Sequence, residues 1–261
     1  MKMKIGASAM LFVAGISVAT SKAAIVFNDN FDTYTVNSAL VGQGGWLQTG
    51  GTTTNPIQVV AGTTSQVAGL VTTGQDAYSA FTAAIPHVTG NMLQTDETIN
   101  VSAAQATGDY FSHLTDVVGG SSVFLQRLFV KSTTGGYLLG LEPTAGGGAV
   151  AIYGTTVLPL STDESIDIIW NFNAGTTADT FAVSVNGVPY AGLTSVPWGS
   201  TLAEPVSLLA ANLRQGTAAS APTVTVDNYE VQGTPAVPEP TSLGLLVAAG
   251  GMMLGRRSRR A

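Results

Sequence analysis

The chain has 261 residues and no cysteine, with 10 Lys and Arg against 16 Asp and Glu. The lack of cysteine excludes disulfide bonds, thiolate metal sites and thiol chemistry. Few charged residues, 10% of the chain, together with 31 glycines, favour an extracellular β protein over a cytosolic enzyme.

The N-terminus has the pattern of a secretory signal peptide. Lys2 and Lys4 precede an apolar stretch over residues 5–18, and small residues follow up to Ala23. We expect a signal helix over residues 1–23, cleaved after Ala23 by signal peptidase. The alternative is an N-terminal transmembrane anchor, which the short apolar stretch disfavours.

Residues 24–234 are predicted to form one domain of about 210 residues. This stretch keeps only three basic residues, Arg127, Lys131 and Arg214, against fifteen acids, so its net charge is −12 (3 minus 15). Such an acidic domain disfavours nucleic acid or anionic phosphate as a partner and favours divalent cations.

Short apolar or alternating runs, separated by Gly, Pro, Thr-Thr and Asn-Gly, predict β-strands throughout this domain. The predicted strands cover residues 24–34, 57–61, 68–72, 77–84, 91–103, 110–114, 123–131, 137–141, 149–153, 165–172, 180–185 and 223–231. Asn186-Gly187 and Gly135-Gly136 predict tight hairpin turns. Residues 204–213 fit either one or two helical turns or another strand.

The fold class predicted from this pattern is all-β. Many short strands at regular spacing indicate two antiparallel sheets packed face to face, as in a sandwich or jelly roll. The domain is similar to concanavalin A-like and laminin-G-like sandwiches. The similarity lies in the segments VFNDNFDTY, GQGGW, SIDIIWNFNAGT, DTFAVSVNG and TVDNYEV. This resemblance implies that the first and last strands are neighbours.

Acidic and amide residues in the first and last predicted strands form a candidate calcium site. Asp29, Asp32 and Asp227 would supply carboxylates if these strands are adjacent, and Asn28, Asn30 and Asn228 would add amide oxygens. The alternative is that these residues cap turns and protect a sheet edge.

Catalytic signals are weak. The segment 165–170 resembles the Glu-x-Asp-x-x-Glu pattern of laminarinase-like glucanases, but Ser165 and Trp170 replace the two catalytic carboxylates, and Glu164 should face the opposite side of the strand. His87 and His113 are too few for a zinc site, and at most one of them is expected to pair with an acid, for example Asp116. We therefore expect no enzyme.

Carbohydrate binding needs an exposed aromatic ring with polar groups nearby. Trp198 lies between Pro197 and Gly199, which suggests a loop, so it is the candidate sugar platform. Trp46 and Trp170 are expected in the core or at an edge.

The C-terminal tail, residues 235–261, has three parts in fixed order. Val237, Pro238, Glu239 and Pro240 precede a short apolar segment over about residues 241–255, and Arg256, Arg257, Arg259 and Arg260 follow. The apolar segment is a candidate short transmembrane helix with a cytoplasmic arginine stop. The alternatives are an ordinary single-span anchor or a buried core helix.

The tail resembles the PEP-CTERM sorting signal of exported bacterial proteins. The resemblance implies membrane insertion and cleavage near Pro238-Glu239-Pro240 by an exosortase, and an association with extracellular polysaccharide. We therefore expect an exported, non-enzymatic surface or matrix protein. A carbohydrate-binding module and a divergent glycoside hydrolase are the alternatives.

Overall fold

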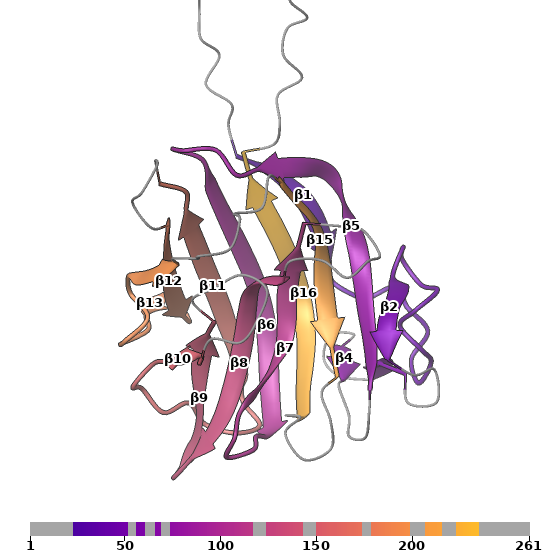
Figure 1. Ribbon diagram of the computed structural model, residues 1–261. Helices are drawn as coiled ribbons and strands as arrows, with labels where there is room; N and C mark the ends of the chain where they lie inside the picture. Colours follow the sequence, from indigo (N-terminus) through magenta and orange to yellow (C-terminus); the bar gives the residue numbers. More distant parts are fainter. Residues whose placement is uncertain are drawn as a thin grey trace, which may run out of the picture.

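The computed structural model describes residues 23–51, 56–60, 66–68, 74–116, 124–142, 150–173, 179–198, 207–215 and 223–234. These residues form sixteen strands and no helix, and the strands build two antiparallel sheets (Figure 1). The predicted all-β, two-sheet sandwich is confirmed.

The nine-stranded sheet has the strand order β13-β12-β11-β6-β16-β4-β3, with β1 paired to β16 and β14 paired to β12. Its strands are β1 (Ala24–Asp29), β3 (Gln58–Val60), β4 (Gln66–Ala68), β6 (Met92–Ala103), β11 (Asp163–Asn171), β12 (Asp179–Val185), β13 (Val188–Pro189), β14 (Val196–Trp198) and β16 (Thr223–Gly233).

The seven-stranded sheet has the order β10-β9-β8-β7-β15-β5-β2. Its strands are β2 (Leu47–Gly51), β5 (Gln75–Pro86), β7 (Asp109–Thr115), β8 (Phe124–Thr133), β9 (Gly136–Leu141), β10 (Ile152–Tyr153) and β15 (Ser207–Arg214). Strands β2, β13 and β14 were not predicted, because runs of two to five residues at sheet edges carry little periodic signal.

Alternating side chains place one face of each sheet in the shared core. On β11, Ile166, Ile168 and Trp170 are buried, together with Glu164, whereas Ser165 is exposed. Glu164 therefore faces away from Ser165, as predicted. The ambiguous segment 204–213 contains β15, which lies between β5 and β7 in the middle of its sheet.

The two predicted turns differ in outcome. Asn186 and Gly187 have φ values of 51° and 74°, which are the two left-handed positions that the predicted hairpin requires. The other turn is displaced by one residue, since Gly136 pairs with Thr133 and the loop is Thr134-Gly135.

A small polar cluster joins the sheets inside the core. Ser112 Oγ on β7 donates to Glu97 Oε1 on β6 at 3.0 Å, and Gln126 Nε2 on β8 donates to Thr95 Oγ1 at 2.5 Å. Glu97 is 3% exposed, and its burial raises the pKa of its carboxyl group to about 7, although the Ser112 hydrogen bond opposes this rise.

The first and last strands are neighbours, as the resemblance implied. Ala24 pairs with Gly233 and Asp29 with Tyr229, so residues 24 and 233 lie at the same end of the sandwich (Figure 1).

The signal segment before Ala23 and the sorting tail, including Val237 to Pro240 and the four arginines, lie outside the described residues. Ala23 itself is exposed. No helix suited to cross a membrane occurs in the part of the chain that the structure describes.

Candidate functional site

All three basic residues of the domain point outward from the seven-stranded sheet. On β8, Leu128 and Val130 are buried in the core, so Arg127, Phe129 and Lys131 project from the opposite side. This side is called the outer face below. The third cation, Arg214 on β15, joins the same side because its guanidinium lies 4.1 Å from the ring centre of Tyr110, which also contacts Arg127.

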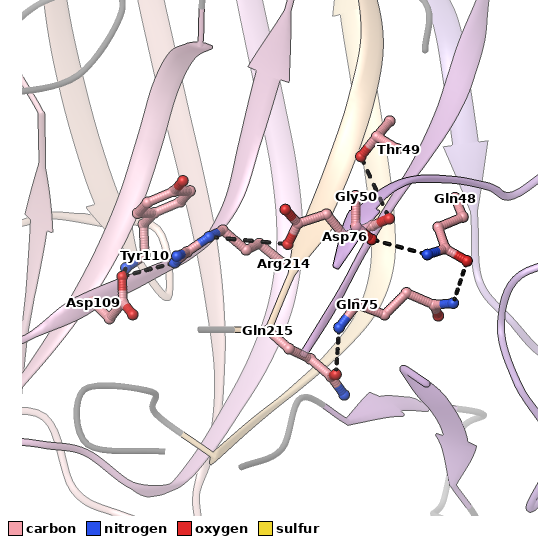
Figure 2. A network of polar contacts seen from close by, with 9 residues as sticks. All are labelled: Gln48, Thr49, Gly50, Gln75, Asp76, Asp109, Tyr110, Arg214 and Gln215. Atoms are coloured by element: carbon pink, nitrogen blue, oxygen red, sulfur yellow. Dashed lines mark hydrogen bonds and ion pairs between the residues drawn. The ribbon is translucent and has the colours of Figure 1, made fainter. Parts of the chain in front are cut away.

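Tyr110 on β7 is held between these two arginines. The guanidinium carbon of Arg127 lies 4.7 Å from the ring centre. Arg214 Nη1 donates to Asp109 Oδ1 at 2.9 Å, and its Nε lies 3.9 Å from Asp76 Oδ1 (Figure 2). Burial raises the pKa of the Asp76 carboxyl; Arg214 opposes this rise, and Asp109 adds to it.

Arg127 has a second, more buried contact. Its Nη1 donates to Glu142 Oε2 at 2.6 Å, and the Glu142 amide donates to the Arg127 carbonyl at 3.3 Å. His113 on β7 packs edge-on against Tyr110, with 5.5 Å between ring centres. Burial, reinforced by Arg127 and Arg214, lowers the pKa of His113 well below its ordinary value, so this imidazole is neutral at neutral pH.

Amide side chains on the core side of the sheet join β2 to its neighbours; Gln75 and Gln215 are buried, and Gln75 Oε1 accepts from the Ile57 backbone N–H. Gln215 Oε1 accepts from the backbone N–H of Gln75 at 2.9 Å, and the side-chain Nε2 of Gln75 donates to Gln48 Oε1 at 3.3 Å (Figure 2). Thr49 Oγ1 donates to the Asp76 carbonyl at 3.4 Å. These bonds tie β2, β5 and the end of β15 together beside the Arg214 site.

Three partly exposed aromatic rings lie on the outer face. Tyr110 and Phe129 are directly opposite on β7 and β8, with 5.3 Å between ring centres. Tyr153 on β10 sits against Gly140, where an added Cβ would come within 2.6 Å of its ring. The Lys131 ammonium lies 5.3 Å from the Tyr153 ring centre.

The prediction that Trp198 is an exposed sugar platform is wrong. Trp198 is 0% exposed and lies 4.8 Å from Trp170 between ring centres. Its segment adds to the sheet as β14, and strand alternation turns Val196 and Trp198 inward and Pro197 outward. Trp46 is buried as well.

The predicted calcium site is not formed by its three carboxylates. Asp29 accepts from the Tyr34 hydroxyl at 2.5 Å and from Trp46 Nε1 at 2.6 Å, so it anchors the loop after β1. Asp227 is buried and accepts from the backbone N–H of Asn228, and Asp32 accepts from the side-chain Nδ2 of Asn30. No three His, Cys, Asp or Glu side chains within the described ranges are placed to hold a metal ion.

Of the two histidines, His87 pairs with an acid, and this acid is Asp179. Its Nε2 lies 2.5 Å from Asp179 Oδ2, and the same carboxylate accepts from Trp170 Nε1 at 3.0 Å and from the Asn173 amide at 2.7 Å. Asp179 is fully buried, so this contact connects the β5–β6 loop to the β11–β12 hairpin within the core.

Comparison with known proteins gives a fold likeness only. No protein-family model matches the sequence, and no curated protein matches it. An alginate lyase solved with alginate trisaccharide superposes with a TM-score of 0.52 at 12% identity, covering 78% of this chain and 96% of that one.

Two further solved structures superpose with similar TM-scores. Peanut lectin gives a TM-score of 0.51 at 10% identity, covering 83% of this chain and 100% of its own. The CBM2 module of the evolved Dit protein of Lactobacillus casei BL23 phage J-1 gives 0.50 at 12%, covering 83% and 98%. At these identities the domain is shown to have the lectin-type β-sandwich fold.

Proposed function

We propose that this protein binds a polysaccharide on the outer face of the seven-stranded sheet and does not cleave it. The observation that carries the proposal is the gathering of Tyr110, Phe129 and Tyr153 on the face that holds all three cations of the domain. Sugar rings offer apolar faces and hydroxyl groups, so partly exposed aromatic rings beside charged donors and acceptors match their chemistry.

Among the fold neighbours, an alginate lyase was solved with alginate trisaccharide, which supports this proposal. The others include a lectin, solved with a 9-residue peptide, and a CBM2 module. Because identity to them is 10–12%, the position of the site rests on the side chains of this chain and not on theirs.

The first prediction concerns Tyr153. Replacing it with leucine removes the flat ring but keeps an apolar side chain against Gly140. We expect affinity for the bound polysaccharide to fall about tenfold, or roughly 1.4 kcal/mol. Isothermal titration against a panel of alginate, polygalacturonate and β-glucans measures this effect.

Val188→Ala serves as the control, since Val188 is exposed on β13 of the other sheet. Equal affinity of Tyr153→Leu and wild type would exclude the outer face as the binding site.

Size-exclusion chromatography of the polymers after long incubation with the protein tests the absence of catalysis. Shortened chains would make the protein a lyase or hydrolase.

We also propose export and exosortase processing, which rest on the tail residues Val237 to Pro240 and the arginines that follow. The second prediction is that the mature protein from its own cells begins near Ala24 and ends near Pro238-Glu239-Pro240. Intact mass spectrometry measures both ends. Replacing this tripeptide with alanines should leave the precursor uncleaved in the membrane, whereas a full-length chain in the cytosol would exclude the proposal.

A further inference from the structure

The ligand of the outer face can be defined further from the placement of charge; this step rests on the proposed polysaccharide binding. Residues 24–234 carry −12, yet their only three basic residues share one face. Among the described residues, Glu142 pairs with Arg127, and Asp76 and Asp109 pair with Arg214. The three cations and these three acids together have a formal charge of zero (3 minus 3), against −12 for residues 24–234 as a whole.

The three cations differ in their availability to a ligand. Arg127 is buried and bound to Glu142 at 2.6 Å, so it supports Tyr110 from the side. The Arg214 side chain is 22% exposed; its Nη1 donates to Asp109 Oδ1 at 2.9 Å, and its Nε lies 3.9 Å from Asp76 Oδ1. Lys131 is half-buried and takes part in none of the ion pairs of the described residues.

The two available cations lie on strands that flank the same neighbour. Arg214 is on β15 and Lys131 on β8, with β7 between them. Two strand spacings separate their backbones by about 10 Å across the sheet. Each cation also contacts an aromatic ring, Tyr110 for Arg214 and Tyr153 for Lys131.

We infer that the ligand is an acidic polysaccharide whose sugar carboxylates are bound by Lys131 and Arg214. A uronate residue has an apolar ring face and a carboxylate on the same sugar, so it can contact an aromatic ring and the adjacent cation together. Elsewhere the excess negative charge of the domain repels such a polymer, which restricts binding to the outer face.

The third prediction tests this assignment with polygalacturonate and with its fully methyl-esterified form, which has the same backbone without charge. We expect wild type to bind the acid form at least tenfold more tightly than the ester, with the difference decreasing in about 0.5 M NaCl. Lys131→Gln should lose most of this preference but keep its affinity for the ester, and Lys131→Arg should retain the preference.

Arg214→Lys provides a second variant that keeps a cation beside Asp109, so a folded protein is expected. Because lysine cannot bind a carboxylate through two donors, its preference for the acid form should fall several-fold. Circular dichroism confirms the fold of each variant.

The outcomes separate this inference from the proposed function. Equal or tighter binding of the ester, or binding of neutral glucans alone, would overturn the acidic ligand and leave polysaccharide binding in place. Binding of no polymer in the whole panel would overturn both.

Discussion

Replacing Arg127 with methionine is expected to lower the free energy of unfolding by about 3–5 kcal/mol. The guanidinium is within 2.6 Å of Glu142, and the two side chains are 10% and 2% exposed. Removing it leaves a carboxylate in a buried position without this partner, and Tyr110 loses one of its two stacked cations. Urea unfolding of the purified domain measures the change.

The matched control is Lys131→Met on the same strand. It removes a cation that makes no ion pair with the described residues, so a change of less than about 1 kcal/mol is expected. The double variant Arg127→Met/Glu142→Leu should recover most of the loss, because it removes both charges. A small effect of Arg127→Met alone would mean that the pair does not support this face.

The stability of the domain is expected to depend on pH through Glu97. Burial raises the pKa of this carboxyl group from 4.5 to about 7. Between these two pH values the folded protein therefore holds a proton that the unfolded chain has released. The contribution of the protonated group to the free energy of unfolding is fully present below about pH 4.5 and is lost as the pH rises through 7. Its size is roughly 3 kcal/mol.

Glu97→Gln keeps the shape of the side chain and an acceptor for Ser112 but cannot ionise. We expect this variant to lack the decrease between pH 4.5 and 7 and to be more stable than wild type at pH 8. Chemical unfolding across this pH range measures the difference. Asp163→Asn, at an exposed position on β11, is the control and should follow the wild-type profile. Parallel profiles for Glu97→Gln and wild type would contradict the prediction.

The sheet architecture was largely predictable, because alternation of apolar residues reports which side of a strand is buried. Residues 165–172 show this alternation most clearly. The Asn186-Gly187 turn was predictable for another reason, because this residue pair favours the left-handed backbone that the hairpin requires. The prediction of Trp198 failed because its Pro and Gly neighbours suggested a loop. The segment instead pairs with β12, and this pairing depends on residues that a local pattern does not include.

The candidate site was only partly within reach of the sequence. Arg127, Phe129 and Lys131 alternate along a predicted strand, so the sequence alone could have placed them on one face. The strongly negative net charge of the domain drew attention away from its few cations. The contact of Arg214 with Asp109 was not readable, since it joins residues 105 positions apart. Long-range register, which decides such contacts, is set by the assembled core.

The antiparallel pairing of β1 with β16 has a mechanical consequence. Ala24 and Gly233 are direct partners at one end of this ladder. An opposed pull on these two residues would load one hydrogen-bonded pair at a time, as in opening a zipper, and the rest of the ladder would not share the force. The sandwich should therefore yield at low tension when stretched between its ends, even if it resists heat and denaturant well.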